Sequence, residues 1–367
     1  MRINIEREEL LKPLALVAGV VERRQTLPVL SNALLRFDGK TLTLTGTDLE
    51  VEVITRLFTS DGEQGEITIP ARKLLDICRA LPPHAKIEIK QGKEKVAIKS
   101  GNSRFTLLTL PTADFPNIET VRWEQTFVLP QKLLKELLEK THFCMAQQDV
   151  RYYLNGLLLE LLAPNQLWAV ATDGHRLALG KTTLDAGING EKQIIIPRKG
   201  VQEIIRFLED TNETAEVQLS SNHLRINLKE LTFTSKLIDG RFPDYNKVIP
   251  AAHTKQIILS REQLHETLSR VAILSNDKYR GAQINLSAGA MKITAHNPEQ
   301  EEAEEELAIT YRGENLEIGF NINYLIEAVT ALGGEAVEVG LTDPNSSCTL
   351  STPGDKKYLY IVMPMRL

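Results

Sequence analysis

Two hydrophobic patterns alternate along this chain, one with a period of two residues and one with the period of a helix. The clearest case is a short strand pattern that runs directly into a helical pattern, and it occurs three times, in residues 3–11, 127–134 and 257–264. Pro130 lies near the helix start in the second copy, where a missing N–H costs little, and Ser260 is placed as an N-cap in the third. The repetition predicts three copies of one structural unit.

A second strand-to-helix pattern recurs halfway through each copy, in residues 67–75, 194–201 and 318–325. The stretches that follow alternate between hydrophobic and polar residues, as in Lys86-Ile-Glu-Ile-Lys-Gln91, which is typical of half-buried antiparallel strands. Each copy should therefore hold two helices and about eight short strands. We predict an α+β fold of three repeated domains, residues 1–120, 121–250 and 251–367, with boundaries near Pro116 and Pro250.

Composition narrows the class of protein. The chain has 367 residues, of which 42% are hydrophobic, and a net charge of −5, which suits a globular protein of two or three domains but gives no general support to nucleic-acid binding. The charged first residues do not form a signal peptide, and no apolar run approaches the ~18 residues of a membrane span. Three widely spaced cysteines, Cys78, Cys144 and Cys348, fit a reducing cytoplasm and show no metal-ligand spacing. We expect a cytoplasmic protein without a metal or cofactor.

One polar turn, Ala171-Thr-Asp-Gly-His-Arg-Leu-Ala178, stands between two apolar stretches. Asp173-Gly174 is a strong hairpin signal, because glycine accepts the positive φ that such turns need. His175 and Arg176 follow side by side at the exit of the turn. Since hairpin turns are commonly polar, these eight residues alone fit a solvated turn as well as a binding site.

Four further segments, taken together with this turn, indicate a known family. They are Arg151-Tyr-Tyr-Leu154, Asp239-Gly-Arg-Phe-Pro-Asp-Tyr245, Asn297-Pro-Glu-Gln-Glu-Glu-Ala-Glu-Glu305 and the terminal Tyr360-Ile-Val-Met-Pro-Met-Arg-Leu367. With them, the chain resembles the bacterial DNA polymerase III β subunit family, the sliding clamps, over its whole length. The resemblance implies a homodimer closed head to tail into a ring. Such a ring encircles duplex DNA of any sequence and tethers the replicative polymerase, the clamp loader, and translesion and repair proteins, which confers processivity.

The repeat agrees with such a ring in size. Two subunits would place twelve helices around the opening, and at ~9 Å between helix axes the opening left inside the helix surfaces is roughly 25 Å. That is wide enough for duplex DNA with a layer of water. The six expected helices of one chain carry a small positive excess in a protein of net charge −5. Solvated helix faces of mixed charge would look much the same.

The resemblance places DNA contacts at a few scattered positions, which are Arg24, Arg72, Gln148, Tyr152 and Tyr153. Arginines can meet phosphates, and tyrosines can stack on bases or sugars, without reading the sequence. Taken by themselves, the two tyrosines are more typical of an alternating strand with one ring buried.

The resemblance also implies a hydrophobic cleft between the second and third domains, where partners dock a short motif with Gln at one end and Leu and Phe at the other. Motif match assigns to this cleft Leu154, Thr172, Gly174, His175, Arg176, Leu177, Pro243, Lys247, Val248, Asn321, Tyr324, Val362, Met363, Pro364, Met365 and Arg366. Methionines are flexible and polarisable, so they adapt to several aromatic or leucine side chains. Arg176 and Arg366 are expected to hold polar groups or a carboxylate of the peptide. Lys247 stands where the family pattern has Arg, so a guanidinium-specific contact is not expected there.

The acidic run from Glu299 to Glu306 fits either a metal site or, more commonly, a solvated acidic edge. The resemblance places this run at the joint between subunits. There Glu301 and Glu304 would face Lys73 and Arg104 of a second subunit, and Leu107 would pack against Ile273 and Leu274.

Two other classes of protein deserve comparison. An enzyme would use Asp173 and His175 as an acid/base pair, with Ser235 or Cys144 nearby, but the sequence holds no G-x-S-x-G, P-loop or H-E-x-x-H motif. We therefore predict a non-catalytic protein. A ring-shaped scaffold that binds proteins without encircling DNA stays open as the alternative, because the DNA signal in the sequence is weak.

Overall fold

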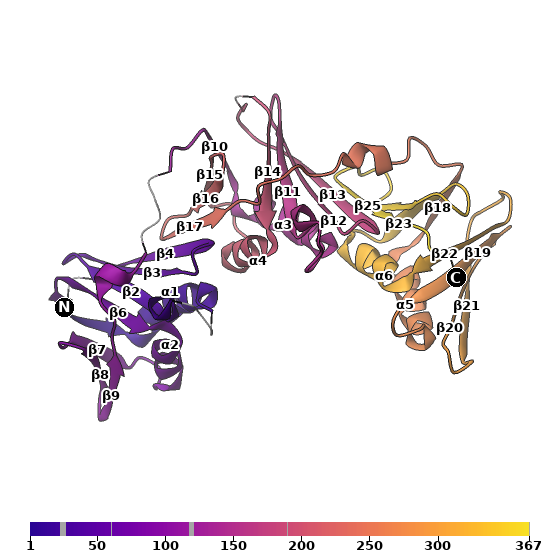
Figure 1. Cartoon of the computed structure of the whole chain (residues 1–367). Helices are drawn as coiled ribbons and strands as arrows, with labels where there is room; N and C mark the ends of the chain where they lie inside the picture. Colours follow the sequence, from indigo (N-terminus) through magenta and orange to yellow (C-terminus); the bar gives the residue numbers. More distant parts are fainter. Residues whose placement is uncertain (23–26, 60, 117–120, 189, 367) are drawn as a thin grey trace. The chain divides into compact units, whose positions relative to one another are not determined.

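The computed structural model describes residues 1–22, 27–59, 61–116, 121–188 and 190–366. Two compact units make up the chain, and each is described by itself (Figure 1). Unit 1 comprises Met1–Lys132 and Gln202–Leu237, and unit 2 comprises Leu133–Val201 and Ile238–Leu367. No helix among the described residues is long and apolar enough to cross a membrane.

Every α-helix in the described part of the chain begins directly after a strand, as the two repeated sequence patterns predict. The six are α1 (Arg7–Val20), α2 (Ala71–Ala80), α3 (Gln131–Glu139), α4 (Arg198–Phe207), α5 (Arg261–Val271) and α6 (Ile322–Ala331). The predicted N-cap of α5 is confirmed, because the Ser260 hydroxyl accepts a hydrogen bond from the backbone N–H of Gln263 at 3.3 Å.

Unit 1 holds two antiparallel sheets. The smaller has the order β5 (Gly62–Glu63), β1 (Arg2–Glu6), β7 (Lys86–Gln91), β8 (Lys95–Ser100) and β9 (Ser103–Leu108). The larger has the order β10 (Gln125–Pro130), β15 (Thr214–Leu219), β16 (His223–Asn227), β17 (Leu231–Lys236), β4 (Val51–Phe58), β3 (Thr41–Thr47), β2 (Asn32–Phe37) and β6 (Gly65–Pro70). Helix α1 packs on α2, β3 and β4, and buries Leu10, Leu14 and Val17 completely. Their spacing puts them on one helix face, and each buried leucine contributes about 1.5–3 kcal/mol.

Unit 2 repeats this design. Its larger sheet has the order β14 (Lys192–Pro197), β11 (Gly156–Leu162), β12 (Gln166–Thr172), β13 (Arg176–Thr183), β25 (Tyr358–Val362), β24 (Cys348–Ser351), β23 (Ala336–Leu341) and β18 (Lys255–Ser260). Its smaller sheet has the order β21 (Glu302–Ala308), β20 (Ala290–His296), β19 (Gly281–Ser287) and β22 (Leu316–Asn321). Helix α5 packs on α6 and β20.

Both larger sheets are made of two four-stranded halves from different copies of the repeat, and the halves meet at one strand pair. In unit 1 this pair is β17 with β4, where Phe233 lies opposite Val53. In unit 2 it is β25 with β13, where Tyr360 lies opposite Ala178. We call these pairs the first junction and the second junction.

Each smaller sheet ends at the strand that, in a larger sheet, would pair with the second half. In sheet order, β9 holds the place of β17 and β25, while β21 holds the place of β4 and β13. Among the described residues each of these two strands pairs on one side only. We call β9 and β21 the open edges.

Candidate functional site

The predicted hairpin is present at the turn between β12 and β13. Gly174 has a φ of +88°, which a residue with a side chain adopts only at a cost. The Asp173 carboxylate accepts hydrogen bonds from the backbone N–H groups of His175 at 2.9 Å and Arg176 at 3.0 Å. Thr172 donates its hydroxyl to the Arg176 carbonyl at 2.6 Å. The turn is therefore held in one conformation by its own side chains.

Arg176 is almost buried, with 11% of its side chain exposed, and its donors are used inside the chain. Its guanidinium donates to Asp173 at 3.0 Å and to the Phe143 carbonyl at 2.9 Å, and it pairs with Glu327. It also lies 4.3 Å from the centroid of the Tyr324 ring. The sequence predicts that this arginine holds polar groups of a peptide. In the structure its guanidinium ties the turn to α6.

The C-terminal segment lies against the same turn. Beyond β25, Met363 donates its backbone N–H to the His175 carbonyl at 2.9 Å, and Met365 donates to the Gly319 carbonyl at 2.8 Å. Met363, Pro364 and Met365 are half-buried. The tail is therefore a fixed wall beside the turn and exposes part of each methionine.

Next to the turn, a cavity of about 450 Å³ opens to solvent within unit 2. Its lining includes Gln147, Asp149, Asp173, His175, Tyr324 and Glu327. The Arg151 guanidinium donates two hydrogen bonds to the Asp149 carboxylate, at 3.0 and 2.8 Å. These bonds lower the pKa of that carboxyl to about 2. Arg176 and Arg198 also line the cavity, so it is polar and carries charges of both signs.

The remaining predicted cleft residues divide into a buried floor and a rim. Leu154, Leu177 and Val248 belong to an apolar cluster with Tyr245 and Ile361. Pro243 and Lys247 are exposed, and the Lys247 ammonium lies 3.6 Å from Asp244. Asn321 caps α6, Val362 is buried beside the turn, and Arg366 is exposed.

The residues predicted to meet DNA lie on two different elements. Arg72 is exposed on α2 and donates to the Val21 carbonyl at 2.8 Å. Gln148 is exposed and has a φ of +56°. Tyr152 and Tyr153 lie in a 3-10 turn, so the interpretation as an alternating strand is wrong. Arg24 lies outside the described residues.

The same loop carries features that the sequence did not single out. Val150 is 96% exposed, and the Arg151 guanidinium also donates to the Asp173 carbonyl at 3.2 Å. Tyr152 is 57% exposed, whereas Tyr153 packs on the apolar cluster beneath the turn. Arg151 thus links the loop of the two tyrosines to the hairpin. The sequence marked Arg151 as the first residue of the Arg151-Tyr-Tyr-Leu154 segment, but it gave no sign of this bond to the hairpin.

The residues predicted at the subunit joint lie on or near the open edges. Arg104 is exposed and Leu107 half-buried on β9, where Leu108, which no sequence pattern marks, is 67% exposed. Lys73 is exposed on α2. Near β21, Ile273 is 75% exposed and Leu274 is half-buried. Glu301 and Glu304 are exposed, and Glu304 pairs with Lys292 at 2.6 Å.

The acidic run forms the edge strand β21. Its alternation places Glu302, Glu304 and Glu306 in solvent. No group of three His, Cys, Asp or Glu side chains in the described part of the chain is placed to hold a metal ion. The structure therefore favours the solvated acidic edge.

Comparison with known proteins assigns the family. Models of the DNA polymerase III beta subunit match the chain in three consecutive stretches, the N-terminal domain at residues 1–119, the central domain at 128–244 and the C-terminal domain at 246–366. The chain belongs to the DNA polymerase III beta subunit family. The predicted three-domain clamp fold is confirmed.

Members of the beta subunit family match the chain from end to end. The beta sliding clamp of Pseudomonas putida is 53% identical, and that of Escherichia coli K12 is 47% identical, with all of both chains covered in each case. The crystal structure of the Pseudomonas aeruginosa sliding clamp bound to griselimycin superposes with a TM-score of 0.97 at 51% identity, again over all of both chains.

The catalytic interpretation finds little support in this beta subunit fold. The Asp173 carboxylate bonds to the backbone of His175 and to Arg176. Cys144 is buried, and burial raises the pKa of its thiol far above neutrality, which suppresses the nucleophilic thiolate. Ser235 is completely buried and donates to the Lys236 carbonyl.

Proposed function

We propose that this chain is a DNA sliding clamp, a non-catalytic subunit that closes into a ring around duplex DNA and tethers a replicative polymerase. Its family supports the proposal, and the observation that carries it is the pair of open edges. In the described part of the chain, two strand junctions join copies of the repeat, while β9 and β21 are left without the partner that a further junction of the same kind would supply. A second copy of the chain can complete it.

The repeat also predicts how the open edges pair. Phe105, Phe233 and Tyr360 are the aromatic residues at equivalent places in β9, β17 and β25. The partner residues also have equivalent places, because Val53, Ala178 and Ala303 are each the second paired residue after the turn that precedes β4, β13 and β21. Val53 lies opposite Phe233 at the first junction, and Ala178 lies opposite Tyr360 at the second.

Phe105 should therefore lie opposite Ala303 of a second copy. This register places Arg104 opposite Glu304 and Thr106 opposite Glu302. The charges agree with it, because oppositely charged residues directly across two strands attract each other. Lys95 and Lys99 on the neighbouring strand β8 add positive charge to the β9 side.

Closure follows from the difference between the two edges. Because β9 and β21 are different surfaces, the contact is head to tail, and such contacts form a ring when the rotation closes. The family implies two subunits, hence three domains in each half of the ring. We place these domains at residues 1–120, 121–250 and 251–367.

DNA contact in this ring is light and scattered. Arg72, Gln148 and Tyr152 are exposed candidates and Tyr153 is a partly buried one, while Arg24, outside the described residues, completes the set proposed from the sequence. Few phosphates are neutralised, so direct affinity should be low and sensitive to salt. A closed ring needs no more, because it leaves the DNA only by opening or by reaching an end.

Partner proteins are proposed to dock beside the hairpin turn. The half-buried methionines of the tail offer an adaptable apolar wall, Leu154 and Leu177 lie beneath it, and the polar cavity beside His175 suits an amide such as that of glutamine. Polymerase, clamp loader, translesion and repair proteins are the proposed partners, each through a short linear motif. Localisation in the cytoplasm stays a prediction.

The test of the proposal is retention on DNA of different topology. The protein is loaded by its clamp loader onto a nicked circle and washed with high salt, and the circle is then cut with a restriction enzyme. We expect the protein to survive the wash and to leave after the cut. Equal retention on circular and linear DNA, with release by salt alone, would overturn encirclement and leave the scaffold as the better account.

A further inference from the structure

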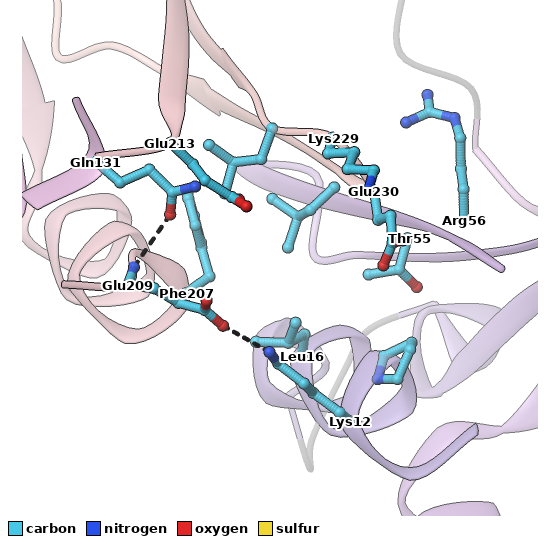
Figure 2. A pocket seen from close by; sticks show the side chains of 13 residues that line it. Lys12, Leu16, Thr55, Arg56, Gln131, Phe207, Glu209, Glu213, Lys229 and Glu230 are labelled. Carbon is cyan, nitrogen blue, oxygen red and sulfur yellow. Dashed lines mark hydrogen bonds and ion pairs between the residues drawn. The ribbon is translucent and has the colours of Figure 1, made fainter. Parts of the chain in front are cut away.

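A second cavity, of about 270 Å³, lies within unit 1 below the first junction. Figure 2 shows it between α1, the end of α4 and the strands of the larger sheet. Leu16, Phe207 and Leu231 are apolar parts of its lining. At one side Lys12 and Glu209 form an ion pair of 2.6 Å that joins α1 to the segment after α4. The cavity is separate from every residue proposed above for DNA or partner proteins.

At the second junction a tyrosine ring takes the corresponding place. Leu231 at the first junction lies opposite Thr55, and at the second junction Tyr358 lies opposite Gly180 in the same place of the register. A Cβ atom built on Gly180 would come within 2.9 Å of the Tyr358 ring. The first junction therefore has a shorter side chain where the second junction has a phenol.

A partly exposed ammonium accompanies that phenol. The Lys357 side chain donates to both carboxylate oxygens of Glu136, at 3.0 and 2.9 Å, next to the tyrosine. Glu136 is the sixth residue of α3, and its counterpart in α1 is Lys12, which is turned to Glu209 instead. The second junction is thus filled by an aromatic ring with an adjacent cation, both supplied by the chain itself.

The lining of the unit 1 cavity carries polar groups that suit a similar guest. Thr55 is 3% exposed, and its hydroxyl oxygen is buried without a hydrogen-bond partner among the described residues. A buried hydroxyl left in this state is destabilising, and a ligand that bonds to it would recover that loss. Glu213 and Glu230 add carboxylates to the lining, while Figure 2 shows the Arg56 guanidinium directed away from the space.

We propose that this cavity is a binding site for a single-ring aromatic molecule that carries a hydrogen-bond donor, a phenol or an amine. The ring lies between Leu16, Phe207 and Leu231, and the donor meets the Thr55 hydroxyl or a carboxylate. Size agrees, because apolar protein cavities of about 150 Å³ already hold benzene. The bound ring would connect α1 to the end of α4 and stiffen the first junction.

Tyramine, which has both a phenol and an ammonium group, is the probe for this site. Binding to the full chain is measured by calorimetric titration, and its position is located by a crystal structure of the complex. We expect saturable binding in the unit 1 cavity. Thr55→Val, which removes the hydroxyl at constant shape, should weaken binding about five- to tenfold, as the loss of one hydrogen bond does.

A second variant fills the site. Leu231→Tyr copies the second junction and should abolish tyramine binding, while Ile258→Tyr, at an exposed isoleucine on β18, should leave it unchanged. Toluene, which has no donor, should bind more weakly than tyramine and respond little to Thr55→Val. Absence of saturable binding to the unmodified chain, or binding that survives Leu231→Tyr, would overturn the proposal.

Discussion

The first and second junctions share a backbone design but differ in what their side chains do. At the second junction, Leu177 and Tyr358 are both buried, and the strand pair continues into the tail and the hairpin turn that form the candidate cleft. At the first junction, the places of these residues are taken by Glu52 and Leu231, and a cavity remains. The strand pairing tolerates this exchange because its hydrogen bonds are made by the backbone. The side chains of one junction can therefore be adapted to bind a partner while the strand pairing of the fold stays the same.

The open edges differ from both junctions in charge. Where the junctions place Val53 or Ala178 among apolar neighbours, β21 carries four glutamates, Glu302, Glu304, Glu305 and Glu306, and β9 carries Arg104. An edge that meets water in the free subunit needs such charges to prevent random pairing with other strands. The same charges make each open edge specific for an edge of opposite charge. A contact between two such edges is also weaker than a junction inside the chain, whose two halves are covalently connected.

The largest effect is expected from removing apolar contact at the open edges. Ile273→Ala combined with Leu274→Ala should leave monomers, because truncating each aliphatic residue buried in a contact costs roughly 2–5 kcal/mol and a ring contains the contact twice. Sedimentation at micromolar concentration measures the outcome. The matched control is Ile258→Ala, at another exposed isoleucine of unit 2, which should stay dimeric. An intact dimer in the double variant would contradict the proposed contact.

Nearly as large an effect is expected at the cleft. Removal of Met363 to Leu367 should abolish binding of a Gln-Leu-x-Leu-Phe peptide, because it deletes the methionine wall and the backbone bonds from Met363 to His175 and from Met365 to Gly319. The dimer should persist. A fluorescence titration of the labelled peptide provides the measurement, with Lys356→Ala, an exposed position before β25, as control. Unchanged affinity in the truncated chain would remove the tail from the cleft.

A charge exchange tests the register of the open edges with a smaller effect. Arg104→Glu and Glu304→Arg should each weaken the dimer, since each places like charges opposite each other. The two substitutions together should restore much of the loss. Dimer dissociation constants from sedimentation give the coupling between the two positions. Additive losses in the double variant would show that the two side chains do not face each other.

The smallest effect is expected at the first junction, where Glu52 is 6% exposed. Burial raises the pKa of Glu52 to about 7, against a smaller opposing effect of Arg225. The fold therefore favours the protonated carboxyl. The protonated carboxyl therefore contributes to the free energy of unfolding. This contribution is complete below pH 4.5, the pKa of the unfolded state, and is lost as pH rises through about 7, the pKa in the fold.

Glu52→Gln should flatten this part of the pH profile and make unit 1 more stable at pH 8, by on the order of 1–3 kcal/mol. Thermal unfolding across the pH range measures it, with Glu50→Gln at an exposed position as control. Identical pH profiles for Glu52→Gln and the unmodified chain would show that this carboxyl does not titrate in the fold.

Periodicity predicted the repeat and the helix starts well, because these depend on local patterns. Pro130 and Ser260 lie directly before α3 and α5, as helix-start chemistry requires. The strand interpretation of Tyr152 and Tyr153 failed, because a 3-10 turn places one ring outside and one on the core, as a short strand would also do.

The states of individual polar side chains were less predictable. The sequence predicts that Arg176 is available to bind a peptide. Its burial against Asp173, Glu327 and Tyr324 depends on α6, which is distant in the chain. The cavity below the first junction was also invisible, since it results from a shorter side chain, Leu231, meeting Thr55 across two copies of the repeat.

One measurement tests the closed ring most directly. Thr106→Cys and Glu302→Cys are introduced together, at positions that the proposed register places opposite each other, where paired strands bring Cα atoms to about 4.5–5.5 Å and a disulfide can form. The native cysteines are buried and should not compete. After loading on a nicked circle and oxidation, the protein should stay linked to the circle in denaturant and be released when the circle is cut. Release from the intact circle by denaturant, despite complete cross-linking between subunits, would contradict a ring closed around DNA.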